Sequence, residues 1–330
     1  MIRFATIGRS WIARLWLDNA LTLPGFALAA VYSRDLAAAR AFAQEYGAKN
    51  AHDNLDALAN DPSVDAVYIA SPNLFHYEQS MWMLKAGKHV LVEKPMSVTR
   101  AQAEAMYAAA DQSGVVLLEA TRNILNPAME RIRDALPSLG TLRRAHLRFC
   151  QYSSKYDRFK AGELPNTFNP ALATGGLMDL GVYPVEVMAY LFGAPQRVAA
   201  VNHMLAHGWD AMGTLICEYP GMQSVITYSK ITQGYAPSEI QGEDGALSIN
   251  HITELSDLVV RLRTGEEHRI ASEPVGSDMM QETRAFLDII AGKRDGTPYR
   301  RCSLTAMGIM EDARQQFARA HQERKTGGPA

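Results

Sequence analysis

The chain has 330 residues, 47% of them apolar, and a formal net charge of −2 at pH 7. This length favours two domains, because single hydrophobic cores stop growing beyond about 250–300 residues. The charge argues against a nucleic-acid-binding surface, and no window reaches the roughly 18 consecutive apolar residues that a membrane helix needs.

The three cysteines, Cys150, Cys217 and Cys302, lie far apart in the chain. Because there is no CxxC motif or Cys/His cluster, we expect free thiols in a reducing compartment and no metal site. The start of the sequence lacks the basic, apolar and small-residue zones of a signal peptide. We therefore expect a soluble, cytoplasmic protein that binds neither nucleic acid nor a membrane.

Short β-rich runs alternate with helical patterns over the first 120 residues. The predicted strands cover residues 4–7, 26–32, 66–70, 89–92 and 115–118, and the predicted helices cover 11–21, 36–46, 78–85 and 99–113. Thr99 and Gln102 form a capping box at the start of the last helix. Apolar strands between helices are typical of a parallel sheet that is covered on both faces. The pattern therefore predicts a doubly wound α/β domain over residues 1–121.

The pattern changes from residue 122 onward. The predicted helices cover residues 127–136, 177–191, 280–291 and 304–320, and the predicted strands lie at 142–152 and between residues 197 and 270. Turn signals such as Pro220–Gly221 separate the later strands. Consecutive strands after a helix predict an α+β second domain, residues 122–330, with a large and mostly antiparallel sheet.

The segment Val198–Ala206 does not alternate cleanly between apolar and polar residues. Such a strand carries apolar side chains on both faces. One face can pack on helices of its own chain, which leaves the other for a partner. We therefore expect a homo-oligomer, most simply a twofold-symmetric dimer, built on the sheet of the second domain.

The hexapeptide Gly8-Arg9-Ser10-Trp11-Ile12-Ala13 lies where the first predicted strand meets the first helix. A dinucleotide fold needs glycine at this turn, so that backbone N–H groups and the helix N-terminus face the pyrophosphate. The usual pattern is G-x-G-x-x-G/A, and Ser10 stands in place of its second glycine. The hexapeptide alone fits a cofactor-binding turn and an ordinary strand–helix turn equally well.

Ser33 and Arg34 follow the second predicted strand. A fold that selects NAD places Asp or Glu there to accept a hydrogen bond from the ribose 2′-hydroxyl. A hydroxyl and a fixed cation suit the 2′-phosphate of NADP instead, so the pair predicts NADP(H) in preference to NAD(H). Two alternatives stay open. Asp35 is the acidic residue if the strand is longer, or the charges only cap the next helix.

Three further segments carry a resemblance to a known family. They are Ser71-Pro72-Asn73-Leu74-Phe75-His76, Ala86-Gly87-Lys88-His89-Val90-Leu91-Val92-Glu93-Lys94-Pro95 and Gly175-Gly176-Leu177-Met178-Asp179-Leu180-Gly181-Val182-Tyr183. Together they resemble the Gfo/Idh/MocA oxidoreductases, the family of glucose–fructose oxidoreductase and inositol dehydrogenase, over nearly the whole chain. The resemblance implies an N-terminal Rossmann domain and a C-terminal open-faced sheet.

The resemblance also implies site residues. The cofactor-binding positions are Gly8, Ser10, Trp11, Ile12, Ser33, Arg34, Ser71, Asn73, His76, Glu93 and Lys94. Lys94 belongs to the E-K-P signature, whose lysine faces the nicotinamide and the reacting carbon, and the Lys94–Pro95 bond is expected to be cis. Arg122 follows the last strand of the first domain and reaches either the cofactor or a carboxylate such as Glu119.

Asp179 and Tyr183 match the D-x-x-x-H pair of sugar and inositol dehydrogenases, with tyrosine in place of histidine, as in dimeric dihydrodiol dehydrogenases. Four residues apart in a predicted helix, they project from one face. Alcohol oxidation needs a base for the hydroxyl proton. Tyr183 takes this role if its pKa falls from about 10 to about 7, roughly 4 kcal/mol, which a nearby ammonium such as Lys94 can supply. Asp179 then orients the substrate, and Lys94 is the alternative proton carrier.

Residues 151–169 combine aromatic rings with lysine and arginine, which suits either a sugar-like ligand or loop packing, and we expect this loop to set substrate choice. The sequence predicts an NADP(H)-dependent oxidoreductase acting on a sugar, polyol or diol. One alternative is a glycosidase or lyase that retains NAD and oxidises only transiently; Ser33–Arg34 argues against it. The other is a catalytically silent ligand sensor, which the presence of Lys94 disfavours.

Overall fold

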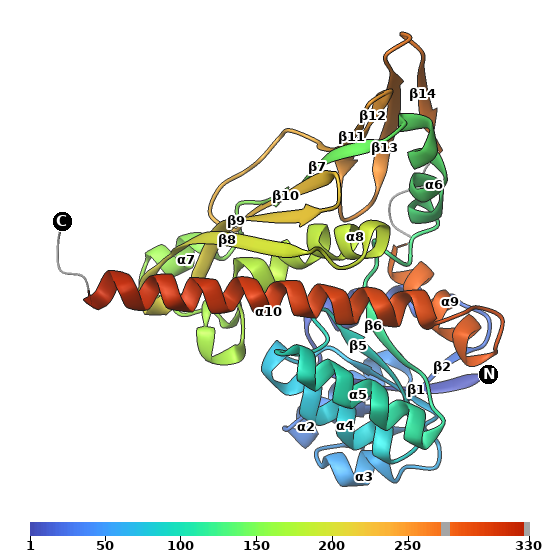
Figure 1. Cartoon of the computed structure of the whole chain (residues 1–330). Helices are drawn as coiled ribbons and strands as arrows, with labels where there is room; N and C mark the ends of the chain where they lie inside the picture. The colour runs from blue at the N-terminus through green and yellow to red at the C-terminus, as the bar shows by residue number, and fades with distance from the viewer. Residues whose placement is uncertain (272–277, 327–330) are drawn as a thin grey trace. The chain divides into compact units, whose positions relative to one another are not determined.

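The computed structural model describes residues 1–271 and 278–326, which form two units (Figure 1). Unit 1 contains Met1–Leu125 and the described residues of Gly276–Leu304. Unit 2 contains the described residues of Asn126–Val275 and Thr305–Ala330. Residues 278–304 therefore join the N-terminal unit, whereas chain order alone groups them with the second domain.

Unit 1 is built on a six-stranded sheet with the order β3-β2-β1-β4-β5-β6. The strands are β1 (Ile2–Ile7), β2 (Phe26–Tyr32), β3 (Asn50–His52), β4 (Ala66–Ile69), β5 (His89–Glu93) and β6 (Leu117–Ala120). Every neighbouring pair is parallel, so the predicted parallel sheet is confirmed. Because β1 pairs with both β2 and β4, the strand order reverses there. Doubly wound sheets bind ligands at the carboxyl ends of the strands beside such a reversal.

The helices of unit 1 connect these strands. They are α1 (Trp11–Ala20), α2 (Leu36–Tyr46), α3 (Leu55–Ala59), η1 (Asn73–Phe75), α4 (His76–Lys85), α5 (Arg100–Ser113) and α9 (Asp278–Ile290). The predicted capping box is confirmed, since the Thr99 hydroxyl accepts a hydrogen bond from Gln102 N, and the Gln102 side chain accepts one from Thr99 N, both at 3.2 Å. The sequence patterns did not predict strand β3 or helix α3. The strand has three residues and the helix five, which is too few to show a hydrophobic period.

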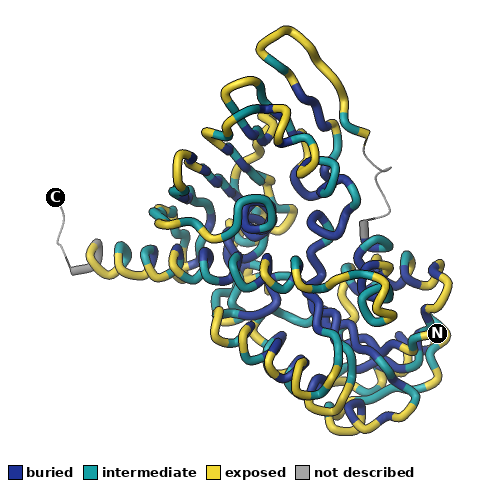
Figure 2. The backbone as a smooth tube through the Cα atoms, turned by 45° about the vertical axis from the view of Figure 1, so that its right-hand side comes forward, coloured by how far each residue is buried: buried dark blue, intermediate teal, exposed yellow. Residues whose placement is uncertain are grey.

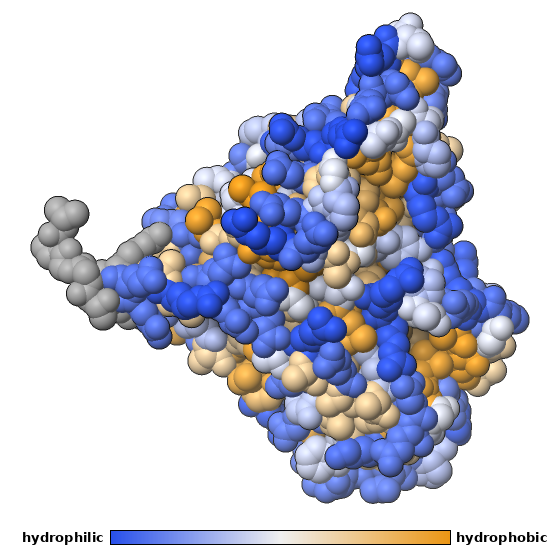
Figure 3. Space-filling view, viewed as in Figure 1, coloured by the Kyte–Doolittle hydropathy of each residue, from blue (hydrophilic) through white to orange (hydrophobic). Residues whose placement is uncertain are grey.

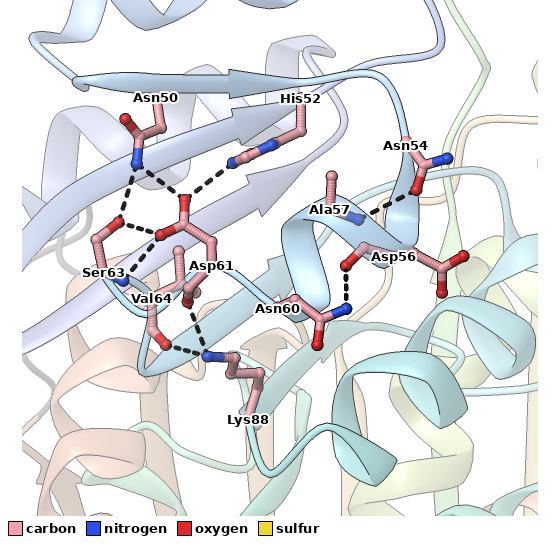
Figure 4. Close-up of polar contacts among 10 residues, drawn as sticks. All are labelled: Asn50, His52, Asn54, Asp56, Ala57, Asn60, Asp61, Ser63, Val64 and Lys88. Carbon is pink, nitrogen blue, oxygen red and sulfur yellow. Dashed lines mark hydrogen bonds and ion pairs between the residues drawn. The ribbon is translucent and has the colours of Figure 1, made fainter.

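A cluster of polar side chains holds the β3 edge of this sheet (Figure 4). The Asp61 carboxylate accepts hydrogen bonds from Asn50 Nδ2 and His52 Nε2, both at 2.9 Å, and from the Ser63 hydroxyl at 2.6 Å. Burial raises the pKa of Asp61, but these hydrogen bonds outweigh it and leave the pKa well below its usual value. Since Ser33 N donates to His52 O at 3.0 Å, the cluster also holds β3 beside the end of β2.

Unit 2 is built on an eight-stranded sheet with the order β14-β13-β12-β11-β7-β10-β9-β8. The strands are β7 (Leu142–Cys150), β8 (Arg197–Met204), β9 (Asp210–Tyr219), β10 (Met222–Ser229), β11 (Ser238–Gly242), β12 (Gly245–His251), β13 (Ser256–Leu262) and β14 (Glu267–Ile270). Among the described strands of this sheet, β7 and β10 are the only neighbours that run parallel, so the predicted mostly antiparallel sheet is confirmed.

The helical segments of unit 2 depart from prediction in two places. They are α6 (Ala128–Ala135), η2 (Leu136–Leu139), α7 (Tyr156–Lys160), η3 (Asn166–Phe168), η4 (Pro170–Leu172), η5 (Leu177–Gly181), α8 (Val182–Phe192), η6 (Ala206–Gly208) and α10 (Thr297–Thr326), which begins in unit 1. The helix predicted over 177–191 begins as the π-helix η5 and continues as α8. The segment predicted as a loop contains α7 and η3. One-turn helices of this kind are stabilised by tertiary packing more than by their own sequence.

The free edge of β8 is covered by its own chain. The Gln316 side chain on α10 accepts a hydrogen bond from Ala200 N at 2.8 Å and donates one to Val198 O at 2.9 Å. These are the bonds that another strand would make, so α10 protects this edge from pairing with other chains.

Buried positions concentrate in the strands and in the helix faces that contact them (Figure 2). The tip of the β13–β14 hairpin is hydrophilic (Figure 3), and residues 263–269 are exposed. Among the described residues, no helix combines the length and apolar character needed to cross a bilayer.

Candidate active site

The turn between β1 and α1 has the backbone geometry that an anion site needs. Gly8 has φ +113°, and a Cβ atom there would lie 2.6 Å from the carbonyl oxygen of Ala70, so the turn requires glycine. Ser10 is the N-cap residue of α1 but makes no side-chain capping bond, and Trp11 and Ile12 begin the helix. The first N–H groups of α1 are thus not capped by Ser10, an arrangement that fits a phosphate at the helix N-terminus.

The end of β2 gathers a hydroxyl and cations. The Ser33 hydroxyl accepts hydrogen bonds from Arg9 Nε at 3.1 Å and from Asp35 N at 3.3 Å, and Arg34 is exposed beside it. Asp35, the alternative acidic residue, caps α2 by accepting a hydrogen bond from Ala38 N at 3.1 Å. Sequence reasoning missed Arg9 because the contact joins residues 24 apart, although its place inside the phosphate-binding turn was a usable signal.

A buried histidine links the segment that follows β4 to the E-K-P segment. His76 Nε2 lies 2.8 Å from Ser71 O, and His76 Nδ1 lies 2.9 Å from Pro95 O. Burial lowers the pKa of His76, and the hydrogen bonds to the two carbonyl groups oppose this shift without reversing it. The Ser71 hydroxyl donates to Gln79 at 2.7 Å, and Asn73 begins η1. The structure thus brings Ser71 and His76 together with the turn that follows Lys94.

Lys94 lies directly after β5, among buried carboxylates. The Glu93 carboxylate accepts hydrogen bonds from the Tyr68 hydroxyl at 2.5 Å and from Lys94 N at 3.2 Å. Burial raises the pKa of Glu93, and the charges of Lys94 and then Arg122 oppose that shift. The Lys94–Pro95 bond is cis, as predicted.

A second buried carboxylate supports the same turn from β6. Glu119 Oε1 accepts a hydrogen bond from Met96 N at 2.7 Å. Burial raises the pKa of Glu119 to about 6. The carboxyl ends of β5 and β6 therefore carry two buried acids next to the Lys94 ammonium, and perturbed acids beside a cation are common in active sites.

In unit 2, glycines allow η5 to approach the sheet closely. A Cβ atom on Gly176 would lie 2.9 Å from the Tyr228 ring, and one on Gly181 would lie 3.0 Å from it. The Tyr228 hydroxyl donates to Asp210 at 3.0 Å, and Asp210 accepts a hydrogen bond from Leu177 N at 2.8 Å. Asp210 thus satisfies a backbone donor at the start of η5 and fixes the helix that carries Asp179.

Asp179 forms an ion pair with Lys230, a residue that sequence reasoning missed. The Lys230 side chain is 7% exposed and that of Asp179 is 34% exposed. Lys230 Nζ also donates to the Thr167 hydroxyl at 2.9 Å. Tyr183, on the first turn of α8, is 7% exposed, and its ring lies edge-on to Phe149 at a centroid distance of 5.6 Å.

Aromatic rings cluster in the segment 151–169, and ion pairs join charged side chains within it. The rings of Tyr156, Phe159 and Phe168 stack on one another, and Phe168 lies 4.3 Å from the Trp209 ring. The Lys160 ammonium lies 5.2 Å from the Tyr156 centroid, within cation–π range. Much of the predicted aromatic and cationic character of this segment is therefore used in its own packing.

Comparison with known families agrees with the two-part architecture. Residues 2–121 match the family described as "Oxidoreductase family, NAD-binding Rossmann fold". Residues 131–248 match the family described as "GFO/IDH/MocA C-terminal domain".

Individual relatives match nearly the whole chain. A scyllo-inositol 2-dehydrogenase (NADP(+)) from Bacillus subtilis is 41% identical over 320 residues, 96% of this chain and 97% of that protein. A trans-1,2-dihydrobenzene-1,2-diol dehydrogenase from Mus musculus is 31% identical over 284 residues, 84% of this chain and 82% of that protein. The structure of a 3-ketoreductase from Actinomadura kijaniata in complex with NADP and TDP-benzene has a TM-score of 0.84 at 25% identity, covering 96% of this chain and 98% of that one. The chain is therefore an NAD(P)-dependent dehydrogenase that belongs to the GFO/IDH/MocA family.

Proposed function

We propose that the protein is an NADP(H)-dependent dehydrogenase or reductase acting on a secondary alcohol, or its carbonyl form, in a sugar, polyol or diol. The relatives named for scyllo-inositol and for a dihydrodiol support this substrate class. The observation that carries the cofactor preference is the Arg9–Ser33 contact with Arg34 next to it. Two guanidinium groups and a hydroxyl suit a 2′-phosphate, whereas a site for the NAD ribose needs an acceptor.

The residues of unit 1 fit this cofactor. The glycine turn at Gly8 and the start of α1 would hold the pyrophosphate, and Arg9, Ser33 and Arg34 would hold the 2′-phosphate. When bound, the nicotinamide supplies or accepts the hydride. The Lys94 segment would lie along the nicotinamide side, as the family resemblance implies.

Three side chains share the remaining chemistry in this proposal. In oxidation the Tyr183 side chain, as its phenolate, takes the proton of the reacting hydroxyl, and in reduction the phenol donates a proton to the carbonyl oxygen. The Lys94 ammonium stabilises negative charge on that oxygen. Asp179 accepts hydrogen bonds from neighbouring substrate hydroxyls and so orients the reacting carbon. The partial exposure of the Asp179 side chain supports this last role.

The cofactor and substrate class can be tested on the purified protein. Mass spectrometry identifies any bound nucleotide, and reduction of NADP⁺ and NAD⁺ is then followed with a panel of inositols, aldoses and diols. Net NADP⁺ reduction with one of them is expected. Tightly retained NAD without net reduction would overturn the proposal in favour of the transient-oxidation glycosidase or lyase.

The role of Tyr183 needs its own variant. Tyr183→Phe keeps the ring and removes the proton, so turnover should fall by roughly 10²–10⁴-fold while NADPH affinity is unchanged. Near-normal turnover would make Tyr183 a packing residue and leave Lys94 as the proton carrier.

We also propose that two copies pair through the sheet face of unit 2. Val201 is 67% exposed on β8, and Ile216 on β9 lies opposite Ala199, so all three share one face. Because Gln316 occupies the edge of β8, we expect pairing through this face and not through the strand edge. Light scattering should show a dimer at micromolar concentration, and a monomer there would contradict the proposal.

A further inference from the structure

Lys230 is a buried cation whose charge is directed at one candidate site residue. It directly follows β10, and its ammonium pairs with the Asp179 carboxylate. Nζ also donates to the Thr167 hydroxyl at 2.9 Å and lies 5.7 Å from the centroid of the Phe168 ring. A buried ammonium is costly without a partner, so these contacts constrain where Asp179 and Thr167 lie.

The backbone of Lys230 joins further segments to the same point. Lys230 N donates to Ala211 O, and Lys230 O accepts from Ser153 N, both at 2.9 Å. Ser153 lies near the start of the 151–169 segment and Thr167 near its end. One residue thus connects both ends of that segment with the π-helix that carries Asp179.

We propose that Lys230 is a positioning residue for the substrate, which orients the Asp179 carboxylate and ties the 151–169 segment to it. This inference rests on the proposed function, because it requires Asp179 to contact the substrate. Without the ammonium, the Asp179 carboxylate loses its ion pair and Thr167 loses its donor. A substrate-binding group displaced by about 1 Å can cost up to 10²-fold in rate.

Two variants separate positioning from folding. Lys230→Met removes the charge but keeps an unbranched chain, and Lys230→Arg keeps the charge. For Lys230→Met we expect kcat/KM for the polyol to fall by about 10- to 100-fold, mainly through KM, while the NADPH dissociation constant stays within about twofold. Lys230→Arg should recover most of the loss. A third variant, Thr167→Val, removes one hydrogen bond without a charge and should raise KM by only about two- to fivefold.

The outcomes distinguish this inference from the function beneath it. Asp179→Asn is measured in parallel. If Asp179→Asn impairs turnover but Lys230→Met leaves KM and kcat unchanged, the positioning role is wrong and the proposed function stands. If Lys230→Arg is as impaired as Lys230→Met and both melt at equally lowered temperatures, Lys230 is only structural, which also overturns the inference. If Asp179→Asn has normal kinetics, the proposed site itself fails. Should Lys230→Met not fold, an unchanged KM in Thr167→Val would overturn the coupling to the 151–169 segment.

Discussion

Two of the regions of unit 1 that bury carboxylates affect their pKa values in opposite ways. Asp61 is surrounded by donors from Asn50, His52 and Ser63, and its pKa lies well below the usual value because these bonds outweigh burial. Glu93 and Glu119, at the ends of β5 and β6, have raised pKa values because burial prevails. Hydrogen bonds set the direction of the pKa shift in the first region, and burial sets it in the second.

The difference separates a structural role from a chemical one. A carboxylate with enough donors is stabilised in its charged form and holds neighbouring segments together. A buried acid with fewer donors costs stability, and such groups persist where chemistry needs them. Glu93 and Glu119 interact with the charge of Lys94, which is the residue that the family resemblance assigns to the reaction.

The largest effect is expected at Lys94, in the region to which we assign a chemical role. Lys94→Met should lower turnover by roughly 10²–10⁴-fold, because charge on the reacting oxygen loses its stabilising cation. The melting temperature should fall as well, because the buried Glu93 and Glu119 lose a favourable charge, but His76 and Glu119 still hold the E-K-P turn. Steady-state kinetics and thermal unfolding measure both, with Lys85→Met, an exposed lysine on α4, as the control. A large loss of stability with normal turnover would show that Lys94 has a structural role and not a chemical one.

Asp61→Ala should show the opposite pattern. The change removes the acceptor of four hydrogen bonds from Asn50, His52 and Ser63, so the free energy of unfolding should fall by about 2–4 kcal/mol. Kinetic constants at low temperature should stay near normal, which urea unfolding and steady-state assays can check. Because the folded pKa is lowered, the stabilisation from Asp61 is present above the unfolded pKa and is lost as the pH falls below about 4. Unchanged stability would show that the cluster is not structural.

Glu119→Gln tests whether the pKa of this buried acid is raised. The folded pKa of about 6 lies above the model-peptide value of 4.5, so the folded state binds more protons between these pH values. Wild-type stability therefore falls as the pH rises from 4.5 to 6, by about 2 kcal/mol, whereas glutamine cannot ionise. Urea unfolding should show that the free energy of unfolding of Glu119→Gln, relative to that of wild type, rises by this amount between pH 4.5 and pH 8. Parallel pH dependence of the two proteins would rule out a raised pKa.

The smallest effect is expected at the proposed 2′-phosphate site. Arg34→Ala and Arg9→Ala should each weaken NADPH binding by about tenfold, because each removes one cation from the 2′-phosphate site. NADH binding should hardly change, and fluorescence titration with both nucleotides compares them. An equal loss for NADPH and NADH would contradict a role in selecting the phosphate.

Local patterns in the sequence determined much of this protein. The alternation of apolar strands and helices identified the doubly wound unit, because burial on both faces leaves a continuous apolar run. Thr99 and Gln102 predicted their own capping box, since both partners lie within one helical turn. The E-K-P and D-x-x-x-Y motifs pointed to Lys94, Asp179 and Tyr183 by resemblance alone.

Tertiary structure alone decided which side chains meet across long sequence separations. Lys230 is 51 residues from Asp179, and Arg9 is 24 residues from Ser33. No periodicity marks such pairs, because they form only when strands and loops from different parts of the chain are brought to one end of a sheet. The same holds for the start of the π-helix that carries Asp179, where Leu177 N donates to Asp210, 33 residues further along the chain. Short-range hydrogen bonding and hydrophobic periodicity are encoded locally, whereas the pairing of buried charges is a property of the folded chain.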